Sequence, residues 1–174
     1  MRKFFVTFFL VIVAYVLQTT ALPSITIADI APNLLLIISA YAGYINGRTV
    51  GLFTGFSIGL LLDCQFGSIL GLYALIYMLI AYLCGFFHKI YFREDSTLPI
   101  IIIVVSDFLY GLLEYIFNFA FRNKLEFGFY LKRIILPEMI YTIIFSIILY
   151  RIMLYLYKHE INILKHKKEV DDFV

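Results

Sequence analysis

The sequence is poor in charge and in the residues that most often carry chemistry. Charged residues make up 15% of the 174, tryptophan is absent, and there are two cysteines and three histidines. Cys64 and Cys84 form no CxxC pair and have no histidine cluster nearby, so neither a metal site nor a redox motif is indicated. The formal net charge of +2 is too small to indicate a nucleic-acid partner.

Enzyme signatures are missing as well. His88, His159 and His166 lack the partner spacing of a catalytic triad, a zinc site or a general-base motif. The sequence contains no phosphate-binding loop and no dinucleotide fingerprint. We therefore expect a protein that is not an enzyme and that uses no cofactor or metal.

Apolar residues are present in large excess. They make up 63% of the chain, and its mean hydropathy is +0.94. Soluble domains are roughly 45–50% apolar and about a quarter charged. A water-soluble fold of this length would leave apolar patches far larger than monomers tolerate, so the lipid bilayer is the expected solvent.

Six apolar runs separated by short polar breaks predict an all-α, polytopic membrane helix bundle. The runs are Phe4–Leu22, Pro32–Tyr44, Val50–Leu62, Ile69–Phe87, Leu98–Phe121 and Ile134–Tyr157. We expect a six-helix transmembrane domain over residues 1–160 and a charged cytoplasmic tail over 161–174. The second and third runs are short for a span of about 20 residues. They either recruit flanking polar residues or include a re-entrant segment, and the sequence leaves open whether residues 32–44 cross fully.

The basic residues predict the topology, because Lys and Arg favour cytoplasmic loops. If all six runs cross and the N-terminus is inside, most of the basic residues are cytoplasmic, which predicts a multi-pass inner-membrane protein with both termini in the cytoplasm. The exception is an external loop from Phe121 to Arg133. It carries four cations, Arg122, Lys124, Lys132 and Arg133. It is either an ordinary solvated loop or a basic surface for an extracytoplasmic partner.

Glycines recur at every fourth position around the third run. Gly51, Gly55 and Gly59 would form a groove without side chains on one helix face, and Gly67 and Gly71 continue the spacing. Such a groove lets another helix approach closely. The approaching helix is either part of the same bundle or a partner's transmembrane helix.

Three residues are expected to shape turns. Pro32 and Asn33 precede the second run and would shape its entry. Asp63 ends the third run, and we expect its carboxylate to fix the turn by accepting hydrogen bonds from the backbone amides that follow it.

Carboxylates at membrane depth need an explanation, because they are costly there. Asp107 and Glu114 lie seven residues apart, hence on one helix face, with Gly111 between them. They could pair with a cation from another helix, remain protonated, or line a polar cavity. Glu138 follows Pro137 at the start of the sixth run, which fits a carboxylate that complements a helix dipole.

The stretch from Ala31 to Gly85 resembles the rod shape-determining protein family MreD. The resemblance rests on the segments APNLLL (31–36), GR (47–48), GLFTGFSIGLLLD (51–63) and LGL (70–72), together with Gly67, Ala74, Tyr77, Tyr82 and Gly85. It covers about a third of the chain and does not extend to Asp107, Glu114 or Glu138.

The resemblance implies a component of the bacterial cell-elongation machinery in the cytoplasmic membrane. Members of the family work with the bitopic scaffold MreC, the actin-like MreB filament, and the peptidoglycan synthase RodA with its class B penicillin-binding protein. The family is also similar in fold to the substrate-binding subunits of energy-coupling-factor transporters.

Two functions follow as expectations. The first is a non-enzymatic membrane scaffold needed for rod shape and sidewall peptidoglycan synthesis, which acts by binding MreC. The second is a vitamin-type substrate-binding subunit of a transporter, with a cavity lined by Asp107, Glu114, Tyr110 and Tyr141.

Overall fold

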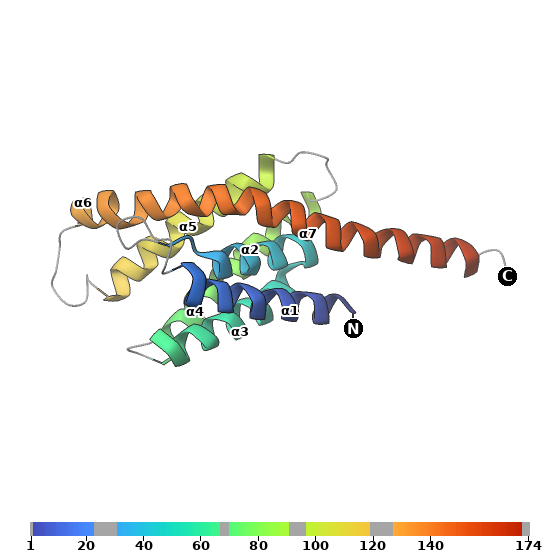
Figure 1. The fold of residues 1–174 in the computed structure, drawn as a ribbon, viewed down its shortest axis with the longest axis horizontal. Helices are drawn as coiled ribbons and strands as arrows, with labels where there is room; N and C mark the ends of the chain where they lie inside the picture. The colour runs from blue at the N-terminus through green and yellow to red at the C-terminus, as the bar shows by residue number, and fades with distance from the viewer. Residues whose placement is uncertain (1, 23–30, 67–69, 91–96, 119–126, 172–174) are drawn as a thin grey trace.

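Helices make up the part of the chain that the computed structural model describes, which is residues 2–22, 31–66, 70–90, 97–118 and 127–171 (Figure 1). The elements are α1 (Arg2–Val16), η1 (Leu17–Ala21), α2 (Leu34–Asn46), α3 (Arg48–Phe66), α4 (Leu72–Cys84), η3 (Gly85–Ile90), α5 (Thr97–Asn118), α6 (Phe127–Tyr130), η5 (Leu131–Ile135) and α7 (Leu136–Asp171). Within these ranges the all-helical prediction is confirmed. In each of the six apolar runs, most of the described residues lie on a helical segment.

In the described part of the chain, two helical segments are long and apolar enough to cross a membrane by length and composition, Leu98–Phe117 and Phe127–Ile152. Shorter apolar helices cover Thr7–Thr20, Leu34–Asn46 and Leu72–His88. A short helix alone in lipid would leave the unbonded backbone groups at its ends in the hydrocarbon region. In a bundle, neighbouring helices can cover these groups. The membrane span count of six therefore stays a prediction.

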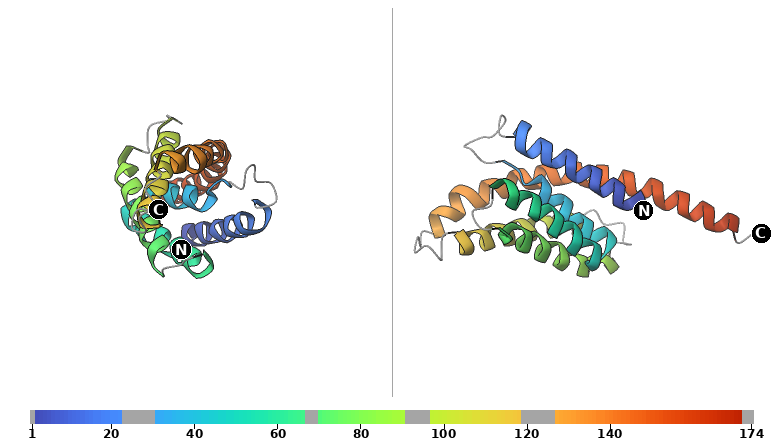
Figure 2. Two further views of the ribbon diagram at one scale, coloured as in Figure 1. Left: turned by 90° about the vertical axis from the view of Figure 1, so that its left-hand side faces the viewer. Right: turned by 90° about the horizontal axis from the view of Figure 1, so that it is seen from below.

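Helix α2 is the centre of the bundle. Its residues from Leu34 to Ile45 are buried without interruption, because α1, α3, α4, α5 and α7 all pack around it. Figures 1 and 2 show this helix enclosed by the others, with α7 continuing beyond the bundle. A helix that is apolar on every side belongs in such a core rather than at a surface.

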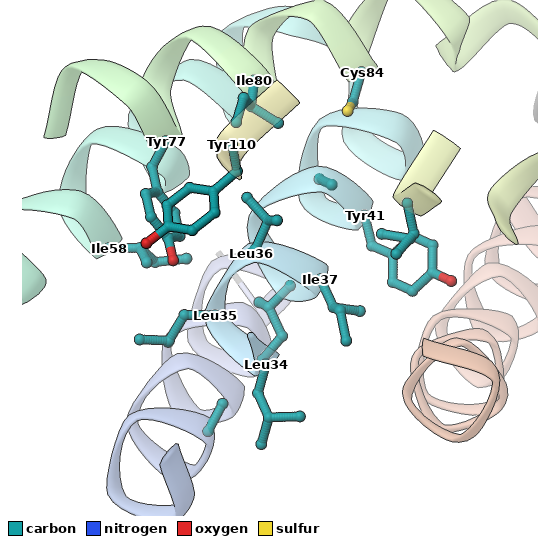
Figure 3. Packing of buried hydrophobic residues seen from close by; sticks show 14 of the residues in the cluster. Leu34, Leu35, Leu36, Ile37, Tyr41, Ile58, Tyr77, Ile80, Cys84 and Tyr110 are labelled. Carbon is teal, nitrogen blue, oxygen red and sulfur yellow. The ribbon is translucent and has the colours of Figure 1, made fainter. Parts of the chain in front are cut away.

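The side chains of α2 meet those of α4 and α5 in one main apolar cluster (Figure 3). Leu35, Leu36 and Ile37 are completely buried there. Tyr77 of α4 and Tyr110 of α5 pack edge to face in the same cluster, with ring centroids 5.6 Å apart. Aromatic pairs in this geometry add stability beyond the area they bury.

The sixth helical segment begins earlier than the sequence predicts. The apolar run starts at Ile134, but the chain is already helical from Phe127 through α6 and η5 into α7. The predicted external loop is therefore wrong for its second half, since Lys132 and Arg133 lie on the π-helical turn η5. A π-helical turn directly before Pro137 fits the lost backbone donor of proline, which disturbs regular helical bonding.

The two ends of the described chain lie at the same end of the bundle. Figures 1 and 2 place the first residues of α1 and the last turns of α7 on that side, with α7 extending past the other helices. This is the arrangement expected when an even number of helical segments runs back and forth.

Candidate functional site

The glycines of α3 lie against the backbone of α4. A Cβ atom added at Gly55 would come within 2.4 Å of the Tyr77 carbonyl oxygen, and one at Gly59 within 2.3 Å of the Ala74 Cα. At Gly51 it would come within 2.6 Å of the Ala81 carbonyl oxygen. No side chain fits at such distances without moving the backbone, so these glycines permit direct contact of the two helices.

Two further glycines extend this close contact beyond α3. A Cβ at Gly43 of α2 would come within 2.1 Å of the Ala81 carbonyl oxygen, and one at Gly85 within 2.5 Å of the Arg48 Cα. The glycine groove is thus filled by α4 from within the same chain. A partner's transmembrane helix has no room in it, so of the two alternatives for this groove the structure fits packing within the bundle.

The other two glycines of the pattern differ. Gly67 lies outside the described residues. Gly71 has a φ of +95°, a conformation that residues with a Cβ rarely adopt, and a Cβ there would meet nothing within 4 Å. Gly71 is therefore required by the backbone turn before α4 and not by packing.

Asp63 caps helix α4 from the end of α3. Its Oδ1 accepts a hydrogen bond of 3.0 Å from the Tyr73 amide, and its Oδ2 one of 2.9 Å from the Ala74 amide. Gly71, the N-cap residue of α4, has no side chain to bond these amides. Asp63 supplies what an N-cap side chain normally supplies, and its negative charge complements the helix dipole. The amides it bonds lie ten and eleven residues further on, not directly after it.

Asn33 connects three helices. Its Oδ1 accepts from the Leu36 amide at 3.1 Å, as an N-cap of α2, and from the Tyr77 hydroxyl at 2.7 Å. Its backbone N–H donates to the Thr142 hydroxyl of α7 at 3.3 Å. Pro32 precedes it, and its carbonyl accepts a bond of 3.2 Å from the Leu34 amide. This entry to α2 is fully buried, so each bond satisfies a group that water cannot reach.

Glu114 joins α5 to α4 and α6. The Tyr73 hydroxyl donates to its Oε1 at 3.2 Å, and the Tyr130 hydroxyl donates to its Oε2 at 3.3 Å. Gly111, one turn earlier, lets α5 approach η5, because a Cβ there would come within 2.9 Å of the Ile135 side chain. Two tyrosine hydroxyls thus satisfy the carboxylate that the sequence left unexplained.

Asp107 is different, although it lies on the same face of α5. It is 3% exposed, and neither carboxylate oxygen has a hydrogen-bond partner among the described residues. Thr142 is its polar neighbour, outside hydrogen-bond geometry. A buried carboxylate without a partner is costly, which marks this position for a test of its role.

Glu138 lies in the first turn of α7. That turn is not a free helix end, because the Leu136 amide already bonds to the Leu131 carbonyl of η5. The helix dipole therefore explains less of its position than the sequence suggests. Asp107 and Glu114 are its acidic neighbours.

The basic residues of the predicted loop divide into two pairs. Arg122 and Lys124 lie outside the described residues. Lys132 and Arg133 are exposed, and the Arg133 guanidinium lies 5.4 Å from the centroid of the Phe129 ring, at cation–π distance. A surface for an extracytoplasmic partner stays a prediction.

Tyr73, Tyr130 and Thr142 are site residues that the sequence did not single out. Each contacts a residue at least 16 positions away along the chain. No local spacing signals such a contact.

The arrangement holds helices together and presents few groups for chemistry. Asp63, Asn33 and Glu114 accept hydrogen bonds from other elements of the same chain. In the described part of the chain, no group of three or more His, Cys, Asp or Glu residues is placed to hold a metal ion. The site is thus suited to fixing a bundle.

A family model described as "rod shape-determining protein MreD" matches residues 1–160. Neither the curated proteins nor the solved structures include a chain that matches this one.

Proposed function

Because the chain belongs to the MreD family of rod shape-determining proteins, we propose that it is a non-enzymatic membrane scaffold of the bacterial cell-elongation machinery. In this role it binds MreC and, in the same complex, MreB, RodA and a class B penicillin-binding protein. Family membership itself assigns the chain to rod shape determination and to a family of membrane proteins. The family match over residues 1–160 is the observation that carries the proposal.

The proposed topology has six spans with both termini in the cytoplasm. It is supported by the common position of the two ends of the chain in the bundle and by the positive charge expected there. In this topology Arg48 and His88 lie at the cytoplasmic boundary, while Asp63 and Lys132 lie near the opposite boundary. A domain boundary near residue 160 and a likeness in fold to energy-coupling-factor subunits belong to the same proposal.

A scaffold needs a rigid body with free outer faces, and the packing supports this reading. The glycine contacts fix α3 on α4, whereas Phe53, Phe56 and Leu60 on the outer side of α3 are exposed. In a membrane these outer faces meet lipid or a partner's helix. MreC binding is therefore assigned to an outer face of the bundle and not to the glycine groove.

Depletion of the protein in its native bacterium tests the function. We expect cells to round and labelled nascent peptidoglycan to disperse from the sidewall. A plasmid copy of the wild-type chain should restore both, and MreC should co-purify with it. Normal shape with normal sidewall insertion in depleted cells would refute the scaffold function.

One observation favours the second candidate, a small-molecule-binding subunit. Asp107 keeps a buried carboxylate without a partner, as a ligand site in a transporter would. The double variant Asp107→Asn with Glu114→Gln separates the two functions. Lost vitamin uptake in cells of normal shape would support transport, whereas rounded cells with normal uptake would support the scaffold.

A further inference from the structure

A cavity of about 480 Å³ separates part of α4 from α5. Its walls include Ile80 and Leu83 of α4, Phe86 of η3, and Ile101 and Val105 of α5. Helices α4 and α5 thus leave an open space between them on this side of α4.

The lining of this cavity excludes a polar ligand. Cys84 and Ser106 are its only lining residues with a heteroatom in the side chain, and their Sγ and Oγ atoms bond each other at 3.2 Å. All other lining side chains are hydrocarbon. A vitamin or nucleotide would lose its hydrogen bonds to water on entry and gain none, whereas a hydrocarbon chain would lose nothing.

The length of the cavity matches one leaflet of a bilayer. Along α5 it extends from Leu98, the second residue of the helix, to Leu109. Eleven residues at 1.5 Å each span about 16 Å, and half of a hydrocarbon core of about 30 Å is about 15 Å. The cavity therefore begins where the helices end, at Phe86 and Leu98, and continues to about the middle of the membrane.

A cation lies beside the end of this cavity that is at Phe86. The guanidinium carbon of Arg48 is 4.4 Å from the centroid of the Phe86 ring, and Phe86 lines the cavity. The Arg48 side chain is exposed. A guanidinium matches the geometry of a phosphate group and binds it through two parallel hydrogen bonds.

We propose that this cavity binds one anionic glycerophospholipid of the bilayer. One acyl chain lies between α4 and α5, and the phosphate of the headgroup lies against Arg48. The apolar lining selects a hydrocarbon chain, the length selects a single leaflet, and the positive charge selects an anionic headgroup. The proposal does not depend on the scaffold function, since a lipid site of this kind suits any role of the bundle.

Native mass spectrometry of the full chain tests the chain-binding part. The protein is purified in detergent, supplied with phosphatidylglycerol, and its retained lipid is counted. Val105→Trp and Ile101→Trp each place a ring in the cavity, and Phe108→Trp is the matched control, because Phe108 lies on α5 but does not line the cavity. We expect both cavity variants to retain about tenfold less lipid than the wild type, and the control to retain the wild-type amount. A tenfold loss corresponds to about two methylenes of the acyl chain that are no longer buried. Equal retention in all folded variants would overturn the proposal.

Arg48→Gln tests the headgroup part. The wild type should retain phosphatidylglycerol over phosphatidylcholine when both are supplied in equal amounts, and the variant should retain the two equally. Two outcomes would overturn the assignment to an anionic glycerophospholipid. One is an unchanged preference in the variant, and the other is retention of a polyprenyl phosphate in place of phosphatidylglycerol from a mixture of the two.

Discussion

Helix α3 and helix α5 are held in the same bundle in opposite ways. At the glycines of α3 the backbones of α3 and α4 meet directly, and the one carboxylate of α3, Asp63, is bonded at both oxygens. The links of α5 to α4 and α6 through Glu114 use the long side chains of Tyr73 and Tyr130, and its other carboxylate, Asp107, has no partner among the described residues. Direct contact between two backbones leaves the helices no room to shift or to accept a larger side chain. Contacts between side chains can adjust, because the side chains can change rotamer. The structure thus pairs a fixed interface with an adaptable one.

The largest expected effect tests the fixed interface. Gly59→Ala puts a Cβ within 2.3 Å of the Ala74 Cα and should cost more than about 3 kcal/mol of folding free energy, because the backbone of α4 has to move. Thermal unfolding in detergent measures it. Gly128→Ala is the control, since a Cβ there meets nothing within 4 Å. Similar melting midpoints for the two variants would show that the α3–α4 contact is not as close as described.

Asp63 tests whether the cap adds to that interface. Asp63→Ala removes two charge-assisted hydrogen bonds to the amides of Tyr73 and Ala74, and we expect a loss of about 3 kcal/mol. Asp63→Asn keeps one acceptor oxygen and should lose roughly half as much. The same unfolding assay measures both variants, and an Asn variant as unstable as the Ala variant would mean that the charge matters more than the bonds.

Asp107 should give the opposite sign. Asp107→Asn replaces a buried, unpartnered carboxyl group with an uncharged amide of nearly the same volume, so we expect the bundle to gain about 1 kcal/mol of stability. Melting curves measure the gain, and rescue of rod shape in depleted cells measures the function. A lower melting midpoint would show that the carboxylate has a stabilising contact. A more stable variant that fails to restore shape would assign the carboxylate a direct role.

The smallest expected loss of stability is at Tyr130. Tyr130→Phe removes one of the two hydroxyls on Glu114 and should cost about 1 kcal/mol, since Tyr73 still bonds the other oxygen. Tyr155→Phe is the control, because Tyr155 is 76% exposed. If Tyr130→Phe and Tyr155→Phe melted together, the bond of Tyr130 to Glu114 would be negligible, and the difference between the two interfaces would be larger still.

The sequence predicts those features of this bundle that depend on the spacing of residues close together along the chain. Apolar runs locate the helices, and the fourfold glycine spacing locates a helix face made for close approach. The spacing does not say which helix approaches, so it is compatible both with another helix of the bundle and with a partner's helix. Asp63 shows the same limit, because a carboxylate at a turn implies bonded amides but not amides ten residues away. The links of Asn33 to Tyr77 and Thr142 depend on contacts 44 and 109 residues apart, for which one sequence carries no signal.

The long helix α7 gives the protein a defined reach. At 1.5 Å per residue, its 36 residues span about 54 Å, well beyond a hydrocarbon core of about 30 Å. On a flexible segment, a partner bound to the far turns of α7 would have no fixed position. A continuous helix fixes both the distance of that partner from the membrane and its angular position around the helix axis. Removing four residues from the projecting part would lower that point by about 6 Å and turn it only slightly, while removing two would turn it to nearly the opposite side. The length of α7 therefore allows the distance from the membrane and the angular position around the helix axis to be changed separately.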